Sequence, residues 1–167
     1  QANIVGVIPS NPADNVALPK VKKPDLKPLM DEDISRFMEA IKGDRFERLF
    51  IVTLFSGMRQ SEVIGLRWDD VELNAGTINV CRQLQKSRST GEYLFIDETK
   101  NGKTRVVSIA PSIVKVLRQQ KTQQLEWRLL AGQHWHNEHN LVFTDECGNH
   151  IRHNTVVYHF KEIVSSL

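Results

Sequence analysis

The sequence predicts an α+β fold, mainly helical with a small three-stranded antiparallel sheet. Apolar residues recur at helical spacing before residue 67 and again after residue 110. Between these regions, short β-favouring segments are separated by glycine, serine, threonine and asparagine. The 167 residues, 40% hydrophobic and 25% charged, also suit one globular domain with a core of its own.

Residues 1–28 are predicted to be a linker. Five prolines, the turn-like stretch "SNPADN" and a basic run leave no room for a long helix. The domain proper is expected to occupy residues 29–167, and a chain that opens in this way is expected to come from a longer protein.

Three helices are predicted next, over residues 30–41, 46–55 and 60–66. The first has an amphipathic pattern and is followed by Gly43, and the second is apolar almost all round and is therefore expected in the core. Ser56 and Gly57 separate the second helix from the third. The apolar positions of the first helix are Ile34, Phe37, Met38 and Ile41.

The three predicted strands are "GTINVCRQL" at 76–84, "GEYLFIDET" at 91–99 and "TRVVSIA" at 104–110. The polar stretch "QKSRST" links the first two, and "KNG" at 100–102 predicts a tight turn between the last two.

A long helix is predicted from Pro111 to about residue 131, because proline is favoured at a first helical position. A polar loop follows, then an extended stretch at 140–151 with a turn at Gly148. The last predicted helix covers 154–167, with Asn154 as its cap. The apolar positions of the long helix are Ile113, Val116, Leu117 and Leu125.

Charge alone does not decide the function. The net charge is +2, and basic residues gather at 20–27 and 86–105, where they could neutralise phosphates or simply be solvated. Cys81 and Cys147 lack the spacing of a zinc site or disulfide framework, so reduced, buried thiols are expected. No apolar run has the length of a membrane span, and no signal peptide pattern opens the chain, so a cytoplasmic protein without membrane contact is expected.

Arg59 is the first candidate for chemistry. It follows a glycine at a predicted helix start, and its planar guanidinium matches two phosphate oxygens. Glu62, one helical turn later, is placed to orient it. The alternative is an exposed i, i+3 ion pair worth only ~0.2–0.5 kcal/mol.

The stretch "SGMRQSEVIGLRWDDVEL" at 56–73 resembles the first catalytic box of the tyrosine recombinases, the phage and mobile-element integrases. That pattern is T/S-G-x-R-x-S-E, three residues, then L-x-W-x-D. The segments "IPSNPADNVALPK" and "ETKNGKTRVVSIAP" are similar to the family's interdomain segment and to its lysine-bearing hairpin. The matching positions of the box are Gly57, Arg59, Ser61, Glu62, Leu66, Trp68 and Asp70.

The resemblance implies site-specific DNA recombination through a 3′-phosphotyrosine intermediate, without a metal or a cofactor. Arg59 and Lys100 would be catalytic, as phosphate ligand and general acid, with Glu62 in support. Lys103 and Arg105 would bind DNA. The implied partners are double-stranded DNA at attachment sites, other copies of the full-length protein in a homotetramer, and accessory DNA-bending proteins.

The family's H-x-x-R box and nucleophilic tyrosine have no match in the chain, so we expect the fragment to be inactive alone. Tyr93 and Tyr158 are far from the nucleophile's place in the family order and are expected to be packing or surface residues. Residues 1–28 would be the interdomain linker that follows a core-binding domain absent from this sequence. Residues 29–167 would be the N-terminal and central part of the catalytic domain.

Two other function classes remain open. A non-catalytic DNA-binding or interaction module with a recombinase-like fold would need only the basic clusters. A metal-dependent hydrolase could use His134, His136 and His139, because imidazole is a common zinc ligand.

Overall fold

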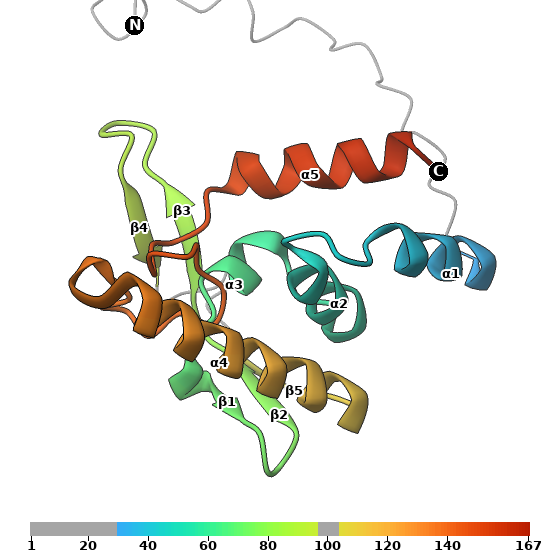
Figure 1. Cartoon of the computed structure of the whole chain (residues 1–167), viewed down its shortest axis with the longest axis horizontal. Helices are drawn as coiled ribbons and strands as arrows, with labels where there is room; N and C mark the ends of the chain where they lie inside the picture. Colours follow the sequence, from blue (N-terminus) through green and yellow to red (C-terminus); the bar gives the residue numbers. More distant parts are fainter. Residues whose placement is uncertain (1–29, 97–103) are drawn as a thin grey trace, which may run out of the picture. The chain divides into compact units, whose positions relative to one another are not determined.

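Three short helices begin the part of the chain that the structure describes. The computed structural model describes residues 30–96 and 104–167 (Figure 1). The helices are α1 (Asp31–Ala40), α2 (Glu47–Ser56) and α3 (Gln60–Ile64), each within two residues of its predicted bounds. The predicted linker at 1–28, Lys100 and Lys103 lie outside the described residues.

The second helix is in the core, as its all-round apolar sequence predicts. Four successive residues of α2, Leu49 to Val52, are buried. The helix ends at Gly57, whose φ of +62° is left-handed and whose backbone N–H donates to the carbonyl of Thr53. The chain then turns into α3, where Val63 and Ile64 are buried.

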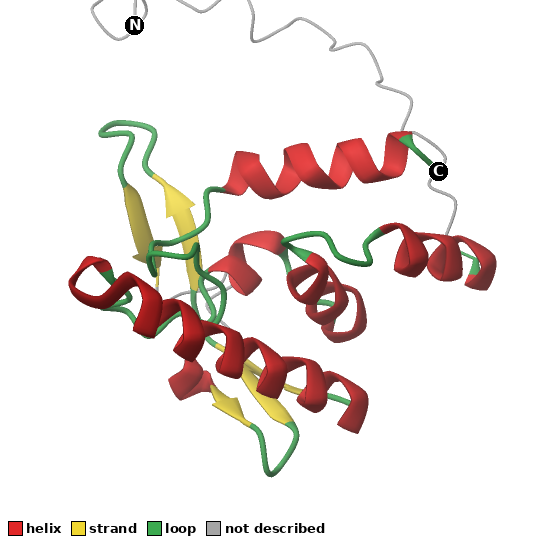
Figure 2. Ribbon diagram, in the orientation of Figure 1, coloured by secondary structure: helices red, strands yellow, loops and turns green. Residues whose placement is uncertain are grey.

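The strands form two small antiparallel sheets (Figure 2). The three-stranded sheet has the order β1-β2-β5, and the other is the hairpin β3-β4. The predicted three-stranded sheet is therefore present, but its members differ. The strands are β1 (Val71–Glu72), β2 (Thr77–Val80), β3 (Gln83–Lys86), β4 (Tyr93–Ile96) and β5 (Arg105–Ser108).

The first predicted strand divides at Cys81 and Arg82, and its two halves join different sheets. At this point Asp70 accepts a hydrogen bond from Cys81 Sγ and forms an ion pair with Arg82. The pairing of the last two predicted strands with each other was wrong within the described residues: β4 pairs with β3, and β5 pairs with β2. The turn predicted at 100–102 lies outside the described residues.

The long helix α4 (Pro111–Ala131) has its predicted bounds. Its apolar residues are not all buried, because the Leu125 side chain is 54% exposed. Gln120 and Gln124 are buried instead, and their amides donate to the backbone carbonyls of Val142 (3.2 Å) and Leu141 (2.9 Å). These carbonyls belong to an irregular buried segment, which needs donors from a neighbouring element.

The C-terminal part agrees with the prediction except at one cap and at Cys147. The burial predicted for the two thiols was wrong, because Cys147 is exposed and Cys81 is only partly buried. Residues 141–144 are buried, and the predicted turn has Gly148 at a φ of +85°. Helix α5 (His153–Ser165) has Arg152 as its N-cap residue, so the predicted cap at Asn154 was wrong by two residues. Val156 is buried, whereas Phe160 is exposed.

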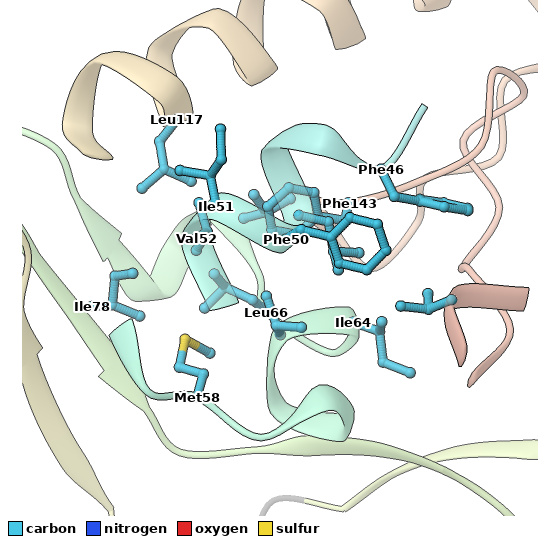
Figure 3. Close-up of a cluster of buried hydrophobic side chains, with 14 of the residues drawn as sticks. Phe46, Phe50, Ile51, Val52, Met58, Ile64, Leu66, Ile78, Leu117 and Phe143 are labelled. Atoms are coloured by element: carbon cyan, nitrogen blue, oxygen red, sulfur yellow. The ribbon is translucent and has the colours of Figure 1, made fainter. Parts of the chain in front are cut away.

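The core lies among α2, α3, α4 and the three-stranded sheet. Figure 3 shows side chains from these elements pointing toward one another, with Ile51 and Leu117 on facing helices and Ile78 beneath them. In residues 30–96 and 104–167, none of the helices has the length and apolar character that crossing a membrane requires.

Candidate functional site

Arg59 and Glu62 make close contact at the start of α3. The backbone N–H of Arg59, the N-cap residue, donates to Glu62 Oε2 at 2.8 Å, and Arg59 Nη1 donates to Oε1 at 2.9 Å. The Glu62 side chain is 1% exposed, whereas that of Arg59 is 57% exposed. The pair is therefore not the exposed surface pair considered as the alternative: a buried carboxylate holds one edge of a half-exposed guanidinium.

A second guanidinium reaches the same carboxylate from the sheet. Arg105, the first residue of β5, donates from Nη1 to Oε1 at 3.0 Å and from Nη2 to Oε2 at 2.7 Å. This is a bidentate contact, which fixes both the distance and the orientation of the two planar groups. Glu62 thus accepts four hydrogen bonds, two on each oxygen.

The electrostatics follow from these contacts. Burial raises the pKa of Glu62, but the hydrogen bonds from Arg105 and from the backbone and side chain of Arg59 outweigh burial and lower that pKa to about 2. The hydrogen bond with Glu62 raises the pKa of Arg105. At neutral pH the three side chains carry two positive charges and one negative charge.

Gly65 allows α3, the helix that carries Glu62, to lie against β3 of the hairpin. A Cβ atom at this position would lie 2.8 Å from the backbone nitrogen of Leu84 and 3.1 Å from the carbonyl carbon of Gln83. Only glycine fits this approach without a shift of the backbone. On the same interface, Ser61 Oγ lies 3.4 Å from the side-chain oxygen of Gln83.

The remaining residues of the box support the fold. Leu66 is buried, and Trp68 packs against the core while its indole N–H donates to Gln124 at 2.7 Å. Asp70 binds Cys81 and Arg82 at the break between β2 and β3. The residues around the Arg59–Glu62 pair thus pack or hydrogen-bond within the fold.

Three of the five predicted site residues, Arg59, Glu62 and Arg105, are brought together. Lys100 and Lys103 lie outside the described residues, and the roles of all five stay predictions. The contact between Arg105 and Glu62 was missed. The available signal was Glu62 itself, because a carboxylate beside the apolar residues Val63 and Ile64 needs more than one partner when it is buried.

The histidine-bearing loop packs against the hairpin. The ring centroids of His139 and Phe95 are 4.3 Å apart, and those of His150 and Tyr93 are 4.5 Å apart. Burial and the nearby Arg152 lower the pKa of His150. Within the described ranges, no three or more His, Cys, Asp or Glu side chains gather in a way that could hold a metal ion.

Residues 27–167 match the profile of the phage integrase family. A tyrosine recombinase XerC-like protein of Caldanaerobacter subterraneus subsp. tengcongensis is 30% identical over 169 residues, which cover 95% of this chain and 41% of that protein. The ICEBs1 integrase of Bacillus subtilis is 25% identical over 145 residues, covering 83% and 38% respectively. The chain therefore spans about two fifths of the length of these curated relatives.

Solved structures show the same fold. The Tn1549 transposon integrase in complex with a circular intermediate DNA has a TM-score of 0.74 at 18% identity, covering 99% of this chain and 53% of the other. The XerA recombinase has a TM-score of 0.58 at 22% identity, covering 84% and 43%.

Proposed function

The chain belongs to the phage integrase family of tyrosine recombinases, and on that premise we propose that it forms part of an enzyme that cuts and rejoins DNA at specific sites. Residues 1–28 are the linker from a core-binding domain, and residues 29–167 are the N-terminal and central part of the catalytic domain. The relatives named above as integrases and as a tyrosine recombinase support this assignment.

The observation that carries the proposal is the hydrogen bonding and the exposure of the Arg59 side chain. Within the described part of the chain its guanidinium hydrogen bonds to Glu62 alone, and more than half of the side chain is open to solvent. A guanidinium oriented in this way presents its remaining N–H groups to an anion with little reorganisation. A DNA phosphodiester matches its planar shape and its charge.

In the proposed reaction, a tyrosine hydroxyl of the full-length protein attacks the phosphorus of a DNA phosphodiester. The O–P bond to tyrosine forms as the bond from phosphorus to the 5′-oxygen breaks, so a 3′-phosphotyrosine and a 5′-hydroxyl result. Arg59 stabilises the charge on the non-bridging oxygens. Lys100 donates a proton to the leaving 5′-oxygen, and the tyrosine proton passes to a base.

The proposal extends to the partners. Lys103 and Arg105 contact the DNA backbone, whose phosphates account for most of the salt-dependent affinity of such proteins. Four copies of the full-length protein assemble on two duplexes, with accessory DNA-bending proteins. Neither a metal nor a nucleotide cofactor takes part in this scheme.

The test uses the full-length protein and DNA fragments from both sides of its gene. Covalent protein–DNA adducts are trapped by denaturation with detergent, collected and sequenced. We expect adducts at a defined junction, and we expect Arg59→Ala to slow their formation by about 10²–10³-fold. Arg128→Ala, at an exposed position in the last turn of α4, is the matched control and should react like the wild type.

Two results would contradict the proposal. Equal rates for Arg59→Ala and the wild type would remove Arg59 from the reaction. A folded full-length protein that binds DNA but forms no adduct with any fragment would instead identify the non-catalytic binding module.

A further inference from the structure

We propose that Arg105 is a positioning residue, which fixes the Glu62 carboxylate and balances its charge so that Arg59 is left to bind the DNA phosphate. This inference rests on the proposed function and adds a role for Arg105 that a direct DNA contact does not include. Three observations carry it: the bond count at Glu62, the charge of the cluster, and the exposure of the two arginines.

The first observation is that Glu62 has no free acceptor position. An ionised carboxylate offers about four lone-pair sites. Arg59 Nη1 and Arg105 Nη1 share Oε1, while the Arg59 backbone N–H and Arg105 Nη2 share Oε2. The carboxylate plane cannot rotate without breaking the bidentate contact, so Arg105 sets the orientation in which Glu62 holds Arg59.

The second observation is the charge balance. Arg59 and Glu62 alone would form a neutral pair, and a neutral pair offers little net attraction to a phosphate. With Arg105 bound to the same carboxylate, the cluster carries one net positive charge. Because Glu62 is 1% exposed, water screens this charge poorly on the buried side, and the excess charge acts through the exposed guanidinium.

The third observation separates the roles of the two arginines. Arg105 uses both terminal nitrogens on Glu62, and its side chain is 36% exposed. Arg59 uses one terminal nitrogen, and its side chain is 57% exposed. The bidentate edge of Arg105 is thus committed within the protein, whereas Arg59 keeps most of its donors for a ligand.

The test combines two variants with two kinds of measurement. Arg105→Gln removes the charge and keeps a hydrogen-bond donor, and Arg105→Lys keeps the charge and loses the bidentate contact. The first measurement is the titration of the Glu62 carboxyl carbon by NMR in the 167-residue chain, which needs no DNA. The second compares DNA affinity with the single-turnover rate of adduct formation in the full-length protein.

We expect Arg105→Gln to raise the titration midpoint of Glu62 from about 2 toward or above its ordinary 4.5. We expect the same variant to slow adduct formation by up to about 10²-fold, the effect typical of a misplaced catalytic group, with a much smaller loss of DNA affinity. Arg105→Lys should restore part of the rate. Arg118→Gln, at an exposed position on α4, should match the wild type in both measurements.

An unchanged Glu62 titration in a folded Arg105→Gln variant would overturn the proposal, whether or not the protein reacts with DNA. Equal losses of affinity and rate, with the Lys variant as good as the wild type, would also overturn it and would leave Arg105 with the direct DNA contact as its only role. If the wild type forms no adduct, the proposed function fails. In that case a raised Glu62 midpoint still supports the positioning of Arg59 by Arg105.

Discussion

Replacing Gly65 by alanine should push α3 away from β3 and destabilise the fold. The backbone at Gly65 has a φ of −95°, which alanine adopts without strain, so the cost is purely steric. The added Cβ would lie 2.8 Å from the Leu84 nitrogen and 3.1 Å from the Ser61 carbonyl oxygen. All these neighbours are backbone atoms, so no flexible side chain can move aside.

The magnitude follows from the required displacement. To restore ordinary contact distances, helix and strand must move apart by roughly half an ångström, and overpacking of this kind costs about 1–3 kcal/mol. With a urea m-value of about 2 kcal/mol/M, the midpoint of unfolding should fall by roughly 0.5–1.5 M. The measurement is urea unfolding of the 167-residue chain followed by circular dichroism.

Gly57 provides the matched control. Its Cβ would meet nothing within 4 Å, but its φ of +62° is unfavourable for alanine. Gly57→Ala should therefore cost about 1 kcal/mol through backbone strain, and Gly57→Asn should cost less, because asparagine tolerates this conformation. At Gly65 the order reverses, because asparagine adds further atoms where there is no room.

A free energy of unfolding for Gly65→Ala within about 0.5 kcal/mol of the wild type would show that the added Cβ meets no steric clash. A better tolerance of asparagine than of alanine at Gly65 would indicate backbone strain in place of a clash.

Two further predictions concern acid stability and the core. The pKa of Glu62 is lower in the folded state than its ordinary 4.5, so its stabilising contribution is complete above pH 4.5 and is lost as the pH falls toward 2. Urea unfolding at several pH values should show that the free energy of unfolding of the wild type falls by roughly 3 kcal/mol over this range, whereas that of Glu62→Gln does not. Parallel losses in both proteins would contradict this role of Glu62. Leu117→Ala, at a fully buried position of α4, should lower the free energy of unfolding by about 2–5 kcal/mol. Leu129→Ala, at an 83% exposed position of the same helix, should change it by less than about 0.5 kcal/mol, and similar losses for both would be inconsistent with the described core.

Much of the fold could be predicted because its signals are local. The helix bounds follow from apolar spacing, from Gly57 and from Pro111, all within one or two turns of the helix ends. Arg59 and Glu62 could likewise be paired from the sequence, because residues three apart on a helix are neighbours.

The errors arose where distant side chains decide the local structure. The division between β2 and β3 coincides with the contacts of Asp70 with Cys81 and Arg82, which a pattern of β-favouring residues cannot show. Arg105 joins Glu62 across 43 positions of the chain, so its role as a partner depends on the sheet topology. The apolar pattern of α4 also does not show that Gln124 is buried while its neighbour Leu125 is exposed.

The two buried glutamines of α4 have a mechanical consequence. Apolar contacts resist separation but allow one surface to slide over another, whereas hydrogen bonds are directional. Gln120 and Gln124 bind two successive carbonyls of the segment 141–144, and Gln124 also accepts the indole N–H of Trp68. These hydrogen bonds oppose both rotation of α4 about its axis and movement of α4 along it. The helix is therefore held in one position relative to the segments that it contacts.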